Sequence, residues 1–226
     1  MKKVAILQSN YIPWKGYFDL IASVDEFIIY DDVQFTKNDW RNRNLIKTPN
    51  GCQWLTIPVG SNIKRNIKDV PLPNGNWKIK HLLTLEFNYA KSKFFNEIYS
   101  LIKSIYLCKN YSSLSEFNTT IIKTICEYLD INTKISFSWD FDLIEGKNDR
   151  LVSLCKQAEA SVYLSGPSAK IYLDESKFKD ENIELSWFNY DGYDVHPQLW
   201  GGFEHKVSIL DLLFNCGKST RNYMKA

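Results

Sequence analysis

Short apolar runs alternate with longer amphipathic stretches along this chain. Val4–Leu7 and Phe27–Tyr30 are apolar runs of strand length, and Tyr17–Val24 between them carries apolar residues at helical spacing. A strand, a helix and a second strand within about thirty residues match the size of one βαβ unit. The pattern therefore predicts parallel strands, with ligands expected at their carboxyl ends.

The middle of the chain is predominantly helical in pattern. Residues 81–109 are mostly apolar and aromatic and predict two helices, and the apolar stripe of residues 114–129 predicts a third, capped by Ser113 or Ser115. Short strands and helices then alternate. We expect strands at 135–139, 162–164 and 183–188, a helix that Asn148 or Asp149 caps, and a helix from Ser208 to Gly217.

This order of elements predicts an α/β fold, with a Rossmann-like, mainly parallel sheet and a helical subdomain in the middle and C-terminal half. We assign residues 1–80 and 160–226 to the α/β core with a basic loop region, and residues 81–159 to a mainly helical insertion or subdomain. Residues 35–80 are irregular apart from a strand predicted at 53–59, where Pro58 indicates a sheet edge or a strand end.

Composition narrows the class of protein. Apolar residues make up 44% and charged residues 24% of the 226 residues, which is typical of a folded domain, and the net charge is only +2. No apolar stretch reaches the roughly 18 residues that span a bilayer, and no secretory leader is evident. The five cysteines are scattered without metal-ligand spacing. We expect a reduced, cytoplasmic protein without a metal site.

Charge is concentrated in one segment. Nine lysines and arginines but only two acidic residues lie between Lys37 and Lys80, a local charge of +7. A local positive field favours a small anionic partner, such as a phosphate or carboxylate compound, over duplex DNA. A solvated basic face without a ligand is the alternative.

The loop after the first predicted strand is the first candidate site. A turn with glycine between a strand and a helix offers backbone N–H groups and the helix dipole to an anion, and aromatic side chains can stack on a ring. The residues assigned to binding here are Gln8, Tyr11, Trp14 and Gly16. The segment has neither a P-loop nor a GxGxxG pattern.

The end of the second predicted strand is the next candidate. Asp31 and Asp32 are adjacent, and because side chains alternate along a strand, only one of them faces a site there. Such a carboxylate can act as a base, orient an amine or hold Mg²⁺. The binding residues predicted beside it, including cations that suit a diphosphate, are Gln34, Trp40, Arg41, Arg43, Asn44 and Lys47. A salt-bridged surface loop is the alternative.

Two later segments add candidates. Ser165, Gly166 and Tyr172 follow a predicted strand and suit a phosphate or carboxylate, although turn chemistry explains them equally well. His196 is a candidate proton shuttle, as is His205, and Gln198 is a candidate binding residue.

Several ordered segments are similar to the WbqC-like protein family over some two hundred residues. They include Tyr11-x-Pro-Trp-x-Gly-Tyr-Phe18, Asp32-Val-Gln-Phe35, Asn42-Arg-Asn-x-Ile-Lys47, Tyr163-Leu-Ser-Gly166 and Ser208-Ile-Leu-Asp-Leu-Leu-Phe-Asn-x-Gly217. The resemblance implies bacterial gene clusters for surface polysaccharide, the O-antigen of lipopolysaccharide. The activity it implies is the addition of an acyl or aminoacyl group to an amino sugar.

A fainter similarity is to the HUP-type nucleotide-binding fold of pantothenate synthetase and the nucleotidylyltransferases. Those proteins carry His-x-Gly-His after the first strand, whereas this chain has Trp14-Lys-Gly-Tyr17. The absence of both histidines argues against histidine-stabilised adenylyl transfer but leaves the HUP-like strand–loop–helix geometry as an expectation.

We therefore expect an N-acyl or aminoacyl transferase that acts on a nucleotide-linked amino sugar, with Asp31, Asp32 or His196 as the base. The expected donor is an acyl thioester or an aminoacyl group, which a carrier protein can present; an ATP-dependent carboxylate–amine ligase using Mg²⁺ is an alternative. Two others are a non-catalytic module that binds a sugar nucleotide or glycan, and single-stranded nucleic-acid binding by residues 37–80, which the near-neutral net charge disfavours.

Overall fold

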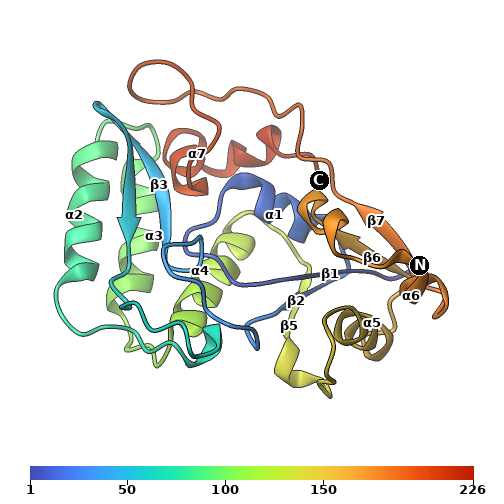
Figure 1. The fold of residues 1–226 in the computed structure, drawn as a ribbon. Helices are drawn as coiled ribbons and strands as arrows, with labels where there is room; N and C mark the ends of the chain where they lie inside the picture. Colours follow the sequence, from blue (N-terminus) through green and yellow to red (C-terminus); the bar gives the residue numbers. More distant parts are fainter.

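The first apolar run becomes the central strand of a five-stranded parallel sheet (Figure 1). The computed structural model describes residues 1–226. Strand β1 (Lys3–Leu7) pairs with β2 (Glu26–Ile29) on one side and with β6 (Val162–Ser165) on the other. The two edge strands are β5 (Lys134–Phe137) and β7 (Glu184–Trp187), and every pairing is parallel.

The strand order β5-β2-β1-β6-β7 reverses direction at one place. The chain builds the sheet outward from β1 through β2 to β5 and then returns to put β6 on the other side of β1. In open parallel sheets, ligands bind at such a switch point, beyond the carboxyl ends of the strands. The order and the parallel pairings confirm the predicted Rossmann-like α/β fold.

The central strands β1 and β2 are buried on both faces, which explains why Val4–Leu7 and Phe27–Ile29 are continuous apolar runs. Ala5, Phe27 and Ile29 point into the larger core, whereas Val4 and Ile28 point into a smaller core on the opposite face. Side chains of a strand alternate between the two faces of the sheet. A strand made only of apolar residues therefore contributes side chains to the larger core and to the smaller core.

Seven α-helices accompany the strands. In Figure 1, α2, α3 and α4 lie together on one side with the hairpin, whereas α5 and α6 lie on the other. The bounds are α1 (Lys15–Ala22), α2 (Trp77–Tyr89), α3 (Phe95–Leu107), α4 (Leu114–Tyr128), α5 (Lys147–Gln157), α6 (Glu175–Lys179) and α7 (Ile209–Cys216). No helix of the chain has both the length and the apolar character needed to cross a bilayer.

The predicted helix ends are correct for two helices and wrong for a third. The Ser113 hydroxyl accepts a hydrogen bond from Glu116 N and so caps α4, and Ser208 caps α7, which ends at Gly217. Neither Asn148 nor Asp149 caps α5, because that helix begins earlier and its N-terminal flanking residue is Gly146 at φ 90°. The division into a core and an insertion at 81–159 stays a prediction.

The basic segment contains a β-hairpin that the sequence pattern did not reveal. Strand β3 (Arg43–Thr48) pairs antiparallel with β4 (Gly51–Thr56) in a sheet of their own. We expected only a strand at 53–59. The sequence Arg-Asn-Leu-Ile-Lys-Thr of β3 lacks apolar–polar alternation because Asn44 and Lys47, which are buried, make specific hydrogen bonds.

A long loop connects β7 to α7. Residues 188–208 contain neither helix nor strand, and in Figure 1 they form the orange-to-red segment that arches over the top of the molecule. Loops of this length in a folded domain commonly carry function.

Candidate functional site

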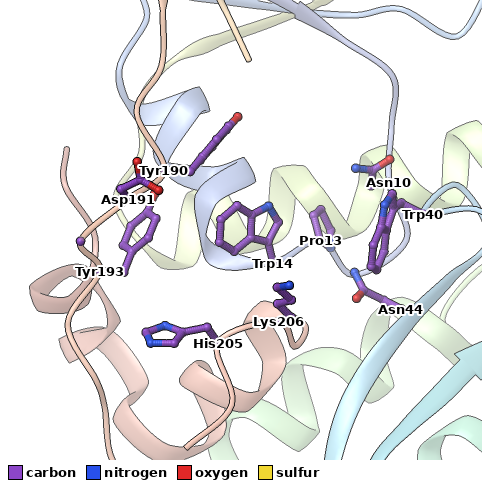
Figure 2. A pocket seen from close by; sticks show the side chains of 11 residues that line it. Asn10, Pro13, Trp14, Trp40, Asn44, Tyr190, Asp191, Tyr193, His205 and Lys206 are labelled. Atoms are coloured by element: carbon purple, nitrogen blue, oxygen red, sulfur yellow. The ribbon is translucent and has the colours of Figure 1, made fainter. Parts of the chain in front are cut away.

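A cavity of about 640 Å³ lies over the loop that follows β1 (Figure 2). We call it the Trp14 cavity. Figure 2 shows Trp14 at its centre, Tyr193 and His205 at one end, and Trp40 and Asn44 at the other. Its lining residues are Asn10, Pro13, Trp14, Trp40, Asn44, Tyr190, Asp191, Gly192, Tyr193, His205 and Lys206. Its size and its aromatic walls with a few polar groups are typical of a small-molecule site.

The floor of the cavity is a strained turn. Ile12 is fully buried and has a φ of 39°, in the left-handed region that a β-branched residue rarely adopts. The Asn44 amide holds this turn, because its Nδ2 atom donates hydrogen bonds to the carbonyl oxygens of Tyr11 at 3.2 Å and Ile12 at 2.9 Å. Strained backbone that its surroundings fix in this way clusters at functional sites.

Asp31 anchors the same loop from below. Its fully buried carboxylate accepts hydrogen bonds from Ser9 N at 2.8 Å and from the Ser115 hydroxyl at 2.5 Å. Burial raises the pKa of Asp31 above that of an ordinary aspartate, although both hydrogen bonds and nearby Arg41 oppose the shift. The residue therefore connects the loop after β1 to the start of α4.

Trp14 depends on Gly16 for its position. The indole ring packs back over the first turn of α1, so that a Cβ atom on Gly16 would overlap it. From there the ring contacts Tyr190 and Tyr193, with ring centroids 5.3 and 5.8 Å apart. The sequence Trp-x-Gly thus places a large aromatic surface at the start of α1.

The wall opposite the loop, residues 189–194, is held by buried charges. The Tyr193 hydroxyl donates to the buried Asp19 carboxylate at 2.6 Å, and Asp19 also accepts from Lys225 N at 2.8 Å and Ala226 N at 2.9 Å. The buried ammonium of Lys15 donates to Asp194 O at 3.1 Å and lies 4.8 Å from the centre of the Tyr193 ring. Burial lowers the pKa of Lys15.

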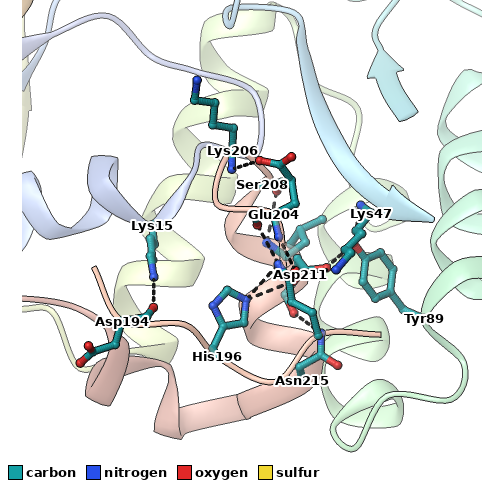
Figure 3. Close-up of polar contacts among 12 residues, drawn as sticks. Lys15, Lys47, Tyr89, Asp194, His196, Glu204, Lys206, Ser208, Asp211 and Asn215 are labelled. Atoms are coloured by element: carbon teal, nitrogen blue, oxygen red, sulfur yellow. Dashed lines mark hydrogen bonds and ion pairs between the residues drawn. The ribbon is translucent and has the colours of Figure 1, made fainter. Parts of the chain in front are cut away.

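The segment that carries His205 and Lys206 rests on a second buried network (Figure 3). His196 Nε2 lies 3.1 Å from Asp211 Oδ1, and the Tyr89 hydroxyl donates to Asp211 Oδ2 at 3.0 Å. The ammonium of Lys47 donates to Gln198 Oε1 at 2.8 Å and to Gly202 O. These bonds fix residues 196–204 against β3 and α7.

A third network lies behind the cavity floor. The Tyr11 hydroxyl is buried and contacts His81 Nδ1 at 2.7 Å and the Tyr106 hydroxyl. Burial lowers the pKa of His81 to about 4, so the ring is neutral at physiological pH. Tyr11 faces the helical layer and not the cavity.

Three of the predicted binding residues line the Trp14 cavity: Trp14, Trp40 and Asn44. Arg41 lies next to it and donates from Nη1 to Asn10 Oδ1 at 2.5 Å. Arg43 stands over the ring of Trp54, 4.2 Å from its centre, on the hairpin that adjoins the cavity. Trp14 of the loop after β1 and Trp40 and Asn44 of the basic segment therefore line one cavity.

The three predicted catalytic residues lie outside the cavity lining. Asp31 and His196 are buried in the contacts given above. Asp32 forms an ion pair with Lys68 and accepts a hydrogen bond from the Ser138 hydroxyl at 2.7 Å. Their catalytic roles stay predictions.

The remaining predicted binding residues are dispersed. Gln8 accepts a hydrogen bond from the Tyr17 hydroxyl through its carbonyl oxygen, and Gln34 is exposed. Ser165 is buried beside Tyr163, and Gly166 lies close to Tyr190 at the end of the cavity.

Tyr172 is the predicted residue on the opposite side of the sheet. It lies under the ammonium of Lys147, which is 3.5 Å from the ring centre. No group of three or more histidine, cysteine, aspartate or glutamate side chains is arranged to hold a metal ion.

Sequence reasoning missed the wall formed by Tyr190, Asp191, Gly192 and Tyr193, together with Asn10, Pro13 and Lys206. A signal for the wall was present, because these residues directly follow the strand predicted at 183–188. In a parallel sheet the carboxyl end of that strand lies at the same edge as the loop after β1.

Sequence comparison connects this site to a family. A family model described as the WbqC-like protein family matches residues 8–223, a range that includes every residue of the Trp14 cavity. The chain belongs to the WbqC-like protein family. The resemblance noted in the sequence is thereby confirmed.

One relative matches the chain over its whole length. It is the uncharacterized protein Rv1507c of Mycobacterium tuberculosis, which is 52% identical over 227 residues, covering 100% of this chain and 98% of the relative. No solved structure matches the chain.

Proposed function

We propose that this WbqC-like protein transfers an acyl or aminoacyl group to the amino group of a nucleotide-linked amino sugar bound in the Trp14 cavity. The observation that supports it is the combination of aromatic surfaces with His205 and Lys206 at the switch point of the sheet. Aromatic rings pack against the apolar face of a sugar or a base, and amide groups such as those of Asn10 and Asn44 orient hydroxyl groups.

In the proposed reaction the sugar amine attacks the carbonyl carbon of the activated acyl group. A C–N bond forms, the carbonyl oxygen becomes an oxyanion, and the bond to the leaving group then breaks. The amine loses one proton to a base, which passes it to the leaving thiolate or alkoxide. The product is an amide, and no oxidant or reductant is needed.

His205 is the base that the geometry favours. It is exposed at the cavity, whereas His196 is buried against Asp211. The adjacent Lys206 is the cation in the lining, suited to a phosphate or to the oxyanion. Arg41 and Arg43, on the other side, are the proposed diphosphate ligands.

The test is incubation with amino-sugar nucleotides and candidate donors, with the amide product detected by mass spectrometry. His205→Gln should lower kcat by about 10²-fold or more, because positioned general bases contribute factors of this size. Trp14→Ala should raise KM for the sugar nucleotide. Trp139→Ala is the matched control, since Trp139 is 40% exposed outside the cavity.

Two results would contradict the proposal: no amide product with any donor, or full activity in the His205→Gln variant. If Asp32→Asn loses activity and His205→Gln does not, the base is Asp32, as the sequence predicted, and not His205. A requirement for ATP and Mg²⁺, with release of phosphate or pyrophosphate, would indicate the ligase alternative.

The exposed indoles at the rim favour a second candidate, a non-catalytic module that binds a sugar nucleotide or a glycan. Trp40 and Trp54 are 44% and 40% exposed and their rings lie 5.6 Å apart. Adjacent exposed indoles are a surface on which planar or sugar rings can stack. Binding of the sugar nucleotide without turnover, weakened by Trp54→Ala, would support this candidate.

A further inference from the structure

A second cavity of about 530 Å³ lies on another part of the molecule. Its walls are the turn between α2 and α3, residues 197–199 of the long loop, and the segment 215–223. We call it the Lys91–Lys93 cavity. It shares no lining residue with the Trp14 cavity, so it is a separate site in the same chain.

The charge of this cavity is positive and unbalanced. Lys91 and Lys93 are in its lining, which contains no aspartate or glutamate. Neither lysine takes part in an ion pair. Their ammonium groups lie 5.9 Å from the Trp200 ring centre and 5.2 Å from the Phe94 ring centre, contacts that keep the two cations at the cavity.

Uncommitted hydrogen-bonding groups accompany the lysines. The Ser219 hydroxyl and the Asn222 amide line the cavity and form no side-chain hydrogen bond within the molecule. Behind the lining, the Nδ1 atom of buried His196 also lacks a partner, and its ring lies 5.8 Å from that of Tyr223 in the wall. A hydroxyl, an amide and two ammonium groups are the donors that bind phosphate oxygens.

We propose that the Lys91–Lys93 cavity binds a phosphate-bearing small molecule, with the two ammonium groups on the phosphate oxygens. A concave site of this volume suits a compound of nucleotide size rather than a lone ion. The proposal does not depend on the transferase reaction, because none of its residues belongs to the Trp14 cavity.

The long loop contributes residues to both cavities, because residues 197–199 line the Lys91–Lys93 cavity and His205 and Lys206 line the Trp14 cavity. Gln198 lines the Lys91–Lys93 cavity, accepts a hydrogen bond from Lys47 and accepts another from Glu204 N at 2.9 Å. His205 and Lys206 follow directly in the chain and line the Trp14 cavity. Gln198 therefore links the wall of the Lys91–Lys93 cavity to the segment that carries His205.

The experiment measures thermal unfolding and calorimetric binding of the full chain with inorganic pyrophosphate at constant ionic strength. The wild type should show saturable binding and a rise in the unfolding midpoint. The double variant Lys91→Gln/Lys93→Gln should bind pyrophosphate at least tenfold more weakly. The control is Lys80→Gln/Lys103→Gln, which removes the same charge from exposed lysines of α2 and α3 outside both cavities.

Equal loss of affinity in both double variants would overturn the proposal, since it would mean a general effect of net charge. Absence of saturable binding to the wild type would also overturn it. An equal affinity for citrate would reject the phosphate assignment. Arg43→Gln, which removes a proposed diphosphate ligand beside the Trp14 cavity, should leave the pyrophosphate affinity that depends on Lys91 and Lys93 unchanged, and this separates the site from the failure or success of the proposed transferase.

Discussion

The indole ring of Trp14 fills the space that a side chain on Gly16 would need. The two residues depend on each other, because glycine has no Cβ and so leaves room for the indole over the start of α1. In this position the indole contacts Tyr190 and Tyr193 of the opposite wall. The aromatic surface of the Trp14 cavity therefore depends on a residue that does not line it.

Gly16→Ala should displace Trp14 and weaken ligand binding in the cavity. The added methyl group overlaps the ring, and overpacking of this kind costs about 1–3 kcal/mol. Urea unfolding and a binding titration with the sugar nucleotide measure the two effects. Gly202→Ala is the control, since a Cβ there meets open space; equal behaviour of both variants would contradict the role of Gly16.

Asn44→Ala should destabilise the fold through the strained turn at Ile12. It removes the two hydrogen bonds to the carbonyl oxygens of Tyr11 and Ile12, a loss of about 1–3 kcal/mol for buried acceptors. Chemical denaturation gives the value. Gln53→Ala, an exposed position on the neighbouring strand of the hairpin, should be within about 0.5 kcal/mol of the wild type.

Asp19→Asn should loosen the wall at residues 189–194. The buried carboxylate accepts hydrogen bonds from the Tyr193 hydroxyl and from two backbone N–H groups at 225 and 226, and an amide would place an NH₂ group against those donors. Hydrogen exchange at 189–194 should accelerate. Asp194→Asn is the control, because only its main-chain oxygen is used, by Lys15; unchanged exchange in Asp19→Asn would refute the anchor.

His81 should make stability fall in mild acid. Burial lowers its pKa from 6.5 to about 4, so between these values the unfolded chain binds a proton that the folded chain does not. The contribution is complete above pH 6.5 and is lost as the pH falls toward 4. The slope from this group is at most about 1.4 kcal/mol per pH unit.

The measurement is the free energy of unfolding of wild type and His81→Gln across this pH range. The variant should lose less stability on acidification, because glutamine does not titrate. Parallel curves for wild type and His81→Gln would rule out the effect.

The sequence predicted β1 and β2 well because these central strands are buried on both faces and carry unbroken apolar runs. The sequence pattern did not predict β3, because two of its buried residues are polar. Asn44 donates a hydrogen bond to Ile12 O and Lys47 donates one to Gln198 Oε1. Binary patterns cannot report such partners, because Gln198 is 151 residues away in sequence from Lys47.

For the candidate site, the sequence located the loop after β1 and part of the basic segment but not the opposite wall. Aromatic residues such as Trp14 were evident from their type and from the adjacent glycine. Tyr190 and Tyr193 were not, because their role depends on the position of β7 in the sheet, which follows from the strand order.

The strand order also constrains how the protein is made. Because β1 pairs with both β2 and β6, a nascent chain that has emerged only as far as α5 leaves the edge of β1 that later pairs with β6 without a hydrogen-bonding partner. Open strand edges of this kind template aggregation. Fragments that stop before residue 160 should therefore aggregate more readily than the full chain, and the Trp14 cavity is complete only after residues 190–206 have been synthesised.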